Sequence, residues 1–197
     1  MDIASLKGYP ARYSSRDDGH GHLLGTQKYS FRTKTNKFYI VNVEEYPHNL
    51  YVVKFHLKDH TDSVWRYHNL THEYDARKII YTCIEIGLKI YEKNPLASFG
   101  FIGCPTQKEA KTTKLLHTKR FKVYRNFATF FFSPDNFEHS FVTEKSSYLL
   151  LNRESKKKNP NIHSDISKMI TECWDLDHLF MPETKKKRKR FRALDMQ

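Results

Sequence analysis

The residues with the clearest chemical capacity stand near the end of the chain, where cations follow one another without interruption. Lys185–Arg190 supplies six positive side chains in a row, and Arg192 adds a seventh. Cations at this density bind phosphate groups with little regard for nucleic-acid sequence. A nuclear-localisation cluster has a similar composition, and a solvated tail that only aids solubility is the alternative. The predicted phosphate contacts are Lys185, Lys186, Lys187, Arg188, Lys189, Arg190 and Arg192.

The charge of the chain is concentrated in short linear clusters. Its 34 Lys and Arg residues outnumber 22 Asp and Glu residues, which gives a formal charge of +12. Without the seven cations of the tail the charge is +5, and the triplet Lys156, Lys157 and Lys158 carries three of those five. A nearly neutral body with a basic tail favours tethering to a polyanion over a deep charged groove.

Basic and aromatic residues also alternate within the body, in segments 28–34, 37–39 and 119–127. Such alternation can pair phosphate contacts with base stacking. On a β-strand it has a second interpretation, in which the aromatic side chains face the core and the basic ones face water. Lys119, Lys122 and Arg125 recur at a spacing of three on a predicted helix. They form a second set of predicted nucleic-acid contacts.

Histidines and carboxylates offer a weaker case for a metal site. His68 and His72 stand four residues apart beside Glu73 and Asp75, a set that could bind a divalent cation on one helical turn. This segment is polar and is predicted to be a loop. No metal site is therefore predicted.

Three cysteines, Cys83, Cys104 and Cys173, are an odd number and lack a Cys-x-x-Cys pair. This usage predicts free thiols in a reducing, intracellular compartment. Cys104 stands at the end of a predicted strand and is a candidate nucleophile with His117 or His139 as its base. The alternative is a small buried side chain with a structural role.

The pattern of apolar residues predicts the elements that must position these groups. A hairpin is expected at 38–43 and 51–57, because both runs are rich in β-branched and aromatic residues around a turn with Pro47. Apolar residues at helical spacing predict the helices, and Pro95 ends the first of them. The expected order after the hairpin is a helix at 74–93, a strand at 99–104, a helix at 111–132, strands at 137–142 and 147–151, and a helix from 164.

This order predicts an α+β fold, with a mixed, largely antiparallel sheet packed by two central helices and a C-terminal amphipathic helix. The expected organisation is an irregular N-terminal arm (1–27), a core domain (28–152), a Lys-rich linker (153–162), an amphipathic helix (163–181) and a basic tail (182–197).

The order of elements over residues 38–152 resembles the core of the GNAT-type acyltransferase superfamily. On this resemblance, Tyr51–Leu57 is the strand before the acyl-CoA helix, Tyr74–Lys93 is that helix, and Phe99–Cys104 is the splayed strand beside it. Tyr124 is similar to the tyrosine that the family uses as a general acid toward the CoA thiolate. The resemblance implies acetyl-CoA as the cosubstrate. The family's glycine loop before the helix is absent, since the chain has no glycine from Thr26 to Ile86.

The C-terminal helix has an apolar face made by Ile166, Met169, Ile170 and Trp174. Such a face docks either on its own domain or in a groove on a protein partner.

The expected function is non-enzymatic binding of nucleic acid, or of a nucleoprotein assembly, chiefly through the tail and without a cofactor. The alternatives are an acyltransferase that uses Tyr124 and an interaction module that uses the C-terminal helix. The longest apolar run, Phe127–Phe132, is too short for a membrane span, and the first residues lack the apolar core of a secretory signal. We expect a cytoplasmic protein with no membrane partner, associated with a nucleoid or, in a nucleated cell, nuclear.

Overall fold

The structure of the chain is a computed structural model, and it describes residues 6–67, 75–102, 119–142 and 147–173. Seven strands form one sheet in the order β1-β2-β3-β4-β5-β7-β6. The strands are β1 (Arg12–Asp18), β2 (Gly25–Arg32), β3 (Phe38–Tyr46), β4 (Leu50–Leu57), β5 (Ser98–Ile102), β6 (Phe137–Val142) and β7 (Ser147–Asn152). The helices are α1 (Ala76–Lys93), α3 (Lys119–Phe131), α4 (Arg153–Lys158), α5 (Ile162–Cys173) and a 3-10 turn, η2 (Lys58–His60).

The sheet consists of two antiparallel parts joined by one parallel pair. Strands β1 to β4 follow one another as an antiparallel meander, and β5, β7 and β6 are also antiparallel to their neighbours. The parallel pair is β4 and β5, and the chain crosses between them through α1. The predicted α+β class and the mixed, largely antiparallel sheet are thereby confirmed.

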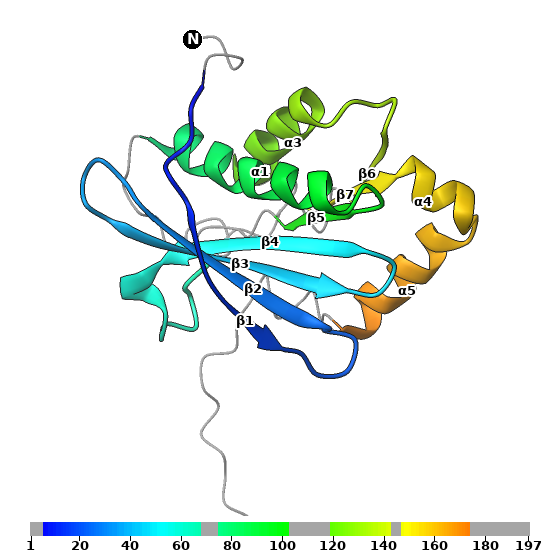
Figure 1. Cartoon of the computed structure of the whole chain (residues 1–197), viewed down its shortest axis with the longest axis horizontal. Helices are drawn as coiled ribbons and strands as arrows, with labels where there is room; N and C mark the ends of the chain where they lie inside the picture. The colour runs from blue at the N-terminus through cyan, green and yellow to red at the C-terminus, as the bar shows by residue number, and fades with distance from the viewer. Residues whose placement is uncertain (1–5, 68–74, 103–118, 143–146, 174–197) are drawn as a thin grey trace, which may run out of the picture.

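Helices cover both faces of the sheet (Figure 1). Helices α1 and α3 lie on one face and enclose the larger core, in which Phe99 touches the rings of Phe132 and Phe137. Helix α5 lies on the other face at one end of the sheet and closes a smaller core with Leu50 and Val52 of β4. Burying a large apolar side chain of this kind contributes about 1.5–3 kcal/mol, so the two cores hold the layers together.

The central helix predicted for residues 74–93 is confirmed as α1. Ile79, Cys83, Ile86 and Ile90 recur at helical spacing and are all buried against the sheet. The helix ends at Lys93, one residue before Asn94 and two before a proline that cannot continue the ladder of hydrogen bonds. The hairpin and the strands predicted at 99–104, 137–142 and 147–151 are confirmed as β3 to β7. Residues 103, 104 and 111–118 lie outside the described part.

The prediction of an irregular arm over residues 1–27 is wrong. Residues 12–18 form β1, and β2 begins at Gly25. Strand β1 is an edge strand whose residues are all exposed, so it carries no alternation of apolar and polar side chains. A β-bulge between Tyr13 and Ser15 shifts the register further. Tyr9 is also part of the core, because its ring stacks on Phe31 with centroids 5.6 Å apart.

The predicted linker at 153–162 is wrong as well, since its first six residues form α4. The side chain of Asn152 caps this helix by accepting hydrogen bonds from the backbone N–H groups of Glu154 (2.9 Å) and Ser155 (3.2 Å). A helix of six residues is too short for an apolar period, and Ser155 is its only buried residue. The local signals of the helix are the capping asparagine, Glu154 in the first turn and the lysines in the last turn, and no apolar period accompanies them. Helix α5 begins at Ile162 and is described as far as Cys173.

Candidate functional site

The predicted phosphate contacts divide between described and undescribed parts of the chain. Lys185–Arg190 and Arg192 lie outside the described residues. On α3, Lys122 and Arg125 are both exposed and stand three residues apart, so they share one face of the helix. Lys119 is the first residue of α3. The helix is fixed to the core by Phe121 and Phe127, which are 1% and 4% exposed. The structure therefore places Lys122 and Arg125 together on the surface of the body.

The alternation of basic and aromatic residues in β2 and β3 follows the two faces of the sheet. Tyr29, Phe31 and Tyr39 point toward α1, and Phe31 and Tyr39 stack with ring centroids 5.2 Å apart. Lys28 and Arg32 occupy the alternate positions of β2 and face the other way. Of the two interpretations that the sequence left open for this segment, the alternation of core and water accounts for these aromatic residues.

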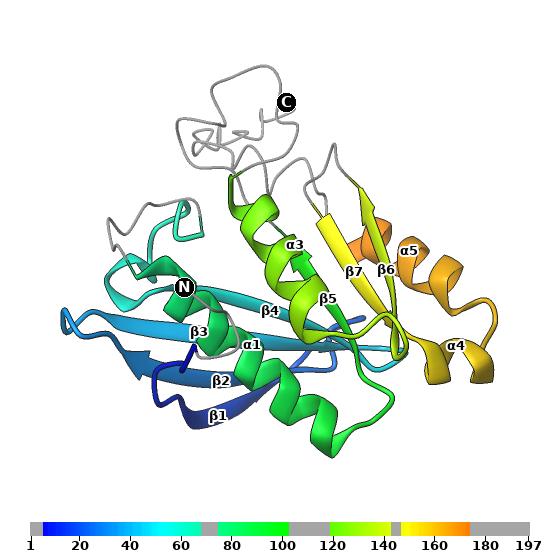
Figure 2. The ribbon, with the colours of Figure 1, turned by 90° about the horizontal axis from the view of Figure 1, so that it is seen from above.

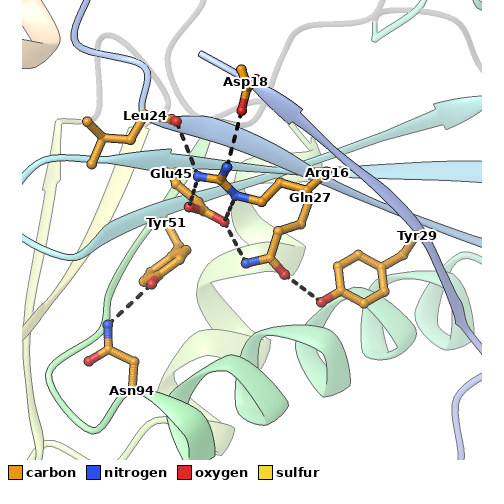
Figure 3. A network of polar contacts seen from close by, with 8 residues as sticks. All are labelled: Arg16, Asp18, Leu24, Gln27, Tyr29, Glu45, Tyr51 and Asn94. Carbon is orange, nitrogen blue, oxygen red and sulfur yellow. Dashed lines mark hydrogen bonds and ion pairs between the residues drawn. The ribbon is translucent and has the colours of Figure 1, made fainter.

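Two carboxylates of the sheet, those of Asp18 and Glu45, are paired with Arg16 (Figure 3). The guanidinium of Arg16 on β1 reaches across β2 and donates to Glu45 of β3, with Nη2 and Oε2 3.0 Å apart. Gln27 donates to the other carboxylate oxygen at 2.7 Å, and its own carbonyl accepts from Tyr29 at 2.8 Å. Burial opposes ionisation of Glu45, but the bonds from Arg16 and Gln27 offset it and lower the pKa. This network ties three strands together.

Other acidic groups are paired in the same way. Asp17 pairs with Lys28, and Glu44 pairs with Lys54 at 2.6 Å. On α4, Lys156 pairs with Glu138 at 2.5 Å and Lys157 with Glu154 at 2.6 Å. Two lysines of the 156–158 triplet therefore serve the local structure.

Strands β4 and β5 are paired only at their first residues. Leu50, Tyr51 and Val52 pair with Ser98, Phe99 and Gly100, and beyond these positions β5 pairs only with β7. Strand β4 continues to Leu57, paired on its other side with β3. Among the described residues, the β5-facing edge of β4 from Val53 to Leu57 has no strand partner. Helix α3 runs over this part of the sheet (Figure 2).

Tyr124 lies at this opening between the strands. Its ring meets that of Phe55 on β4 edge-on, with centroids 6.4 Å apart and planes at 66°. The side chain is half-buried and packs against the larger core. The structure therefore brings the candidate general acid to the unpaired part of β4.

In the acyltransferases that the order of elements resembles, a phosphate-binding loop leads into the helix that would correspond to α1. Asp75 is the N-cap residue, and its carboxylate accepts a hydrogen bond from the hydroxyl of Tyr9 at 2.5 Å. Arg77 is exposed in the first turn, and the ammonium group of Lys78 lies 4.4 Å from the ring centre of Tyr9. Positive charge at this helix start therefore comes from side chains.

Among the described histidines, His56 is the one that is buried. His56 is 4% exposed, its ring meets Tyr67 edge-on, and its Nδ1 atom has no hydrogen-bond partner in the described part of the chain. Burial, with help from Arg66 and His60, lowers the pKa of His56 to about 4. Within the described ranges, no three His, Cys, Asp or Glu side chains are grouped as metal ligands would be. His68 and His72 lie outside those ranges.

His139, one candidate base for a cysteine nucleophile, is engaged at both ring nitrogens. The Nε2 atom lies 2.9 Å from the carbonyl oxygen of Phe132, and Nδ1 lies 2.7 Å from the hydroxyl of Tyr148. Since a carbonyl can only accept, Nε2 carries the proton and Nδ1 accepts from the tyrosine. Burial also lowers the pKa of His139 and raises that of the Cys83 thiol. Cys104 and His117 lie outside the described residues.

The apolar face of α5 is turned toward its own sheet. Ile166 is fully buried and Met169 is 5% exposed, both in the smaller core beneath β3 and β4. Ile170 is half-buried at the edge of that core, and Trp174 lies beyond the described part of the helix. Of the two docking modes left open by the sequence, these side chains adopt the intramolecular one.

One cluster of cations was not found from the sequence. Phe38, at the start of β3, has the Arg32 guanidinium carbon 5.0 Å and the Lys58 ammonium 5.3 Å from its ring centre. The basic–aromatic segments contained Arg32 and Phe38, but Lys58 comes from another part of the chain. The pairing of Tyr39 with Leu57 brings it there. A strand register of this kind has no local signal in the sequence.

Comparisons with known proteins give no family assignment. No protein-family model, no curated protein and no solved structure matches the chain. Among the described helices, none combines the length and apolar character needed to cross a bilayer.

Proposed function

We propose that the protein binds nucleic acid, chiefly through electrostatic contacts of its basic tail. The observation that carries this proposal is the set of seven cations at Lys185–Arg190 and Arg192, which hold more than half of the net charge of +12. Each cation that neutralises a phosphate releases condensed counterions, so such a tail supplies affinity without sequence preference. Exposed Lys122 and Arg125 on α3 add positive charge to the folded body.

The test compares the full-length chain with a variant that has glutamine at all seven tail positions. Labelled duplex and single-stranded oligonucleotides are titrated across roughly 50 to 200 mM salt, the range over which phosphate contacts give a steep dependence. The variant should bind more weakly to every sequence, and the slope of log K against log salt should fall by about 0.7–0.9 for each phosphate that the tail no longer neutralises. A variant with the tail residues in scrambled order keeps the charge and should bind like the original chain. Unchanged affinity and slope in the glutamine variant would rule the proposal out.

A second candidate function, acyl transfer from acetyl-CoA, is favoured by the opening between β4 and β5. The backbone groups at the unpaired edge of β4, from Val53 to Leu57, can form hydrogen bonds with an extended, amide-bearing ligand as they would with a neighbouring strand. In this proposal an acceptor amine or hydroxyl attacks the thioester carbonyl carbon, the carbon–sulfur bond breaks, and Tyr124 donates its proton to the departing thiolate. The proton lost by the acceptor passes to solvent, from which Tyr124 is protonated again. Arg77, exposed at the start of α1, would face the phosphates.

The test of this second function is thermal stabilisation by acetyl-CoA. A ligand at one hundred times its Kd stabilises the folded state by about 2.7 kcal/mol, which is an easily measured shift. ATP serves as the control. Its phosphates bind a basic tail as those of acetyl-CoA do, but ATP lacks the amide-bearing arm of acetyl-CoA. A shift with acetyl-CoA that exceeds the shift with ATP supports the function. Equal shifts, or none, exclude it.

A further inference from the structure

Two cations lie around one aromatic ring at the end of the sheet where β2 turns into β3. The ring is that of half-buried Phe38, the first residue of β3. The guanidinium carbon of Arg32 lies 5.0 Å from the ring centre and the ammonium nitrogen of Lys58 lies 5.3 Å from it. Attraction between a cation and the face of an aromatic ring accounts for both positions.

The backbone brings these three residues together without relying on flexible side chains. Arg32 is the cross-strand partner of Phe38 in the β2–β3 pair. Tyr39 pairs with Leu57 in the β3–β4 pair, so Lys58, the next residue after β4, stands beside Phe38. Two antiparallel registers thus fix the distance between a cation at the end of β2 and a cation after β4.

The turn between the strands also holds the guanidinium in place. Asn36 adopts a left-handed backbone conformation with φ of 62°, and its side-chain oxygen accepts a hydrogen bond from Arg32 Nη1 at 2.9 Å. The backbone N–H of Thr33 donates to the carbonyl of Lys37 at 3.0 Å and closes the turn. Because Arg32 is held by both a ring and an amide, it loses little further side-chain entropy on binding an anion.

The cations of this cluster differ from two other cations on the same face of the sheet in having no carboxylate partner. Lys28 and Lys54, on the same face, are paired with Asp17 and Glu44. Neither Arg32 nor Lys58 takes part in any ion pair of the described residues, although both are exposed. Two cations that share one ring repel each other, and an anion placed between them relieves this repulsion.

We propose that Arg32 and Lys58, positioned by Phe38, bind the phosphodiester backbone of a nucleic acid. This inference rests on the proposed nucleic-acid-binding function and gives it a contact on the folded body, distinct from Lys122 and Arg125 of α3. The guanidinium can bind two oxygens of one phosphate, and the ammonium can act as a point charge on the same or the next phosphate. Exposed Lys34 on the β2–β3 turn extends the positive surface beyond the ring.

The experiment uses the full-length double variant Arg32→Gln/Lys58→Gln and the oligonucleotide titration at several salt concentrations. Removing both cations from the phosphate backbone should lower the slope of log K against log salt by about 1.4 to 1.8 and weaken binding at least about tenfold near 0.1 M salt. The matched control, Lys89→Gln/Lys93→Gln, removes the same net charge from exposed positions on α1. Its affinity should change by less than about twofold, since these lysines bind no phosphate and their removal only lowers the overall field.

A third variant, Phe38→Leu, removes the ring but keeps both cations and a similar apolar volume. Each cation–ring contact at an exposed site is worth about 0.5–1 kcal/mol, so affinity should fall by about two- to fivefold while the salt slope stays the same. Thermal melting of all three variants confirms that each is folded under the conditions of the titration.

The outcomes separate this inference from the proposed function. If the original chain binds nucleic acid and the double variant has the same affinity and slope, the site on the body is overturned and the tail remains. If the α1 control loses as much affinity as the double variant, only net charge matters and the inference is again overturned. No binding by the original chain overturns both.

Discussion

The hydroxyl of Tyr9 donates a hydrogen bond of 2.5 Å to the carboxylate of Asp75, although 66 residues separate the two along the chain. The backbone N–H of Tyr9 also donates to the hydroxyl of Thr82 at 2.8 Å. Asp75 is the N-cap of α1, and Thr82 lies in the second turn of that helix. The segment before β1 is thereby fastened along the first half of the central helix.

We expect Tyr9→Phe to destabilise the protein by about 1.5–3 kcal/mol, because it removes a hydrogen bond to a charged group while keeping the buried ring. For a chain of this size each kcal/mol lowers the Tm by about 2–4 °C. Thermal unfolding followed by circular dichroism measures the change. Tyr13→Phe is the matched control, since Tyr13 is 57% exposed. An equal Tm for the two variants would contradict this account of the contact.

Asn152 joins two parts of the chain, and its replacement should be costly. Its side-chain oxygen caps α4, and its side-chain nitrogen donates to the carbonyl of Pro95 at 2.8 Å. Asn152→Ala removes the cap and leaves buried carbonyl groups without a donor, so we expect about 2–4 kcal/mol of destabilisation. Urea unfolding at constant temperature measures it. Asn126→Ala, at an exposed position of α3, should cost far less, and similar destabilisation at both sites would show that the buried hydrogen bonds do not matter.

The depressed pKa of His56 predicts how stability depends on pH. The side chain titrates near 4 in the folded protein and near about 6.5 when unfolded, so between these values the unfolded state binds more protons. Stability should therefore be complete above about pH 6.5 and fall as the pH drops toward 4, by at most about 3 kcal/mol from this group. Urea midpoints at intervals across this range measure the slope.

The variant His56→Phe isolates this contribution. It keeps a ring against Tyr67 and removes both the titration and the buried Nδ1 atom that has no partner among the described residues. Its stability should depend less steeply on pH between 4 and 6.5. His20→Gln, at an exposed position, should keep the slope of the original chain. If both variants have the same slope as the original, His56 does not cause it.

Ile166 tests whether α5 belongs to the folded domain. Its side chain is fully buried in the smaller core, so Ile166→Ala should cost about 2–5 kcal/mol. Lys168→Ala, at an exposed position on the same helix, should change stability by less than about 0.5 kcal/mol. The free energy of unfolding in urea gives both numbers. A small effect at Ile166 would mean that α5 does not pack on the sheet in solution.

The sequence predicts best those elements whose own side chains carry a strong period. Helix α1 and the strands β3 and β4 each bury one regular set of apolar residues, so their positions follow from local spacing. Strand β1 and helix α4 bury almost nothing, and their positions depend on the partner strand and on a single cap. Residue spacing contains no information about the partner strand, and one cap residue is a weak signal for so short a helix.

The candidate site was predicted less completely than the fold, for a related reason. Exposed Lys122 and Arg125 share a helix face, which their spacing predicted. The cluster at Phe38 depends on Lys58, which follows β4. Only the pairing registers of β2, β3 and β4 bring Lys58 near Arg32. Predictions for Lys185–Arg190 and Arg192 stay predictions, because those residues lie outside the described part of the chain.

The short pairing of Leu50–Val52 with Ser98–Gly100 has a consequence for how the chain reaches its fold. This parallel β4–β5 pair is the seam of the sheet. On either side of the seam the strands pair with partners that are close in sequence, and the exception is β5 with β7. Loop closure makes such local pairs faster to form than the parallel pair, which must wait for α1 to be in place. The β1–β4 meander and the β6–β7 hairpin should therefore form as separate units before β5 joins them. The seam between β4 and β5, held by three residue pairs, and the β5–β7 ladder should be the last strand contacts to form.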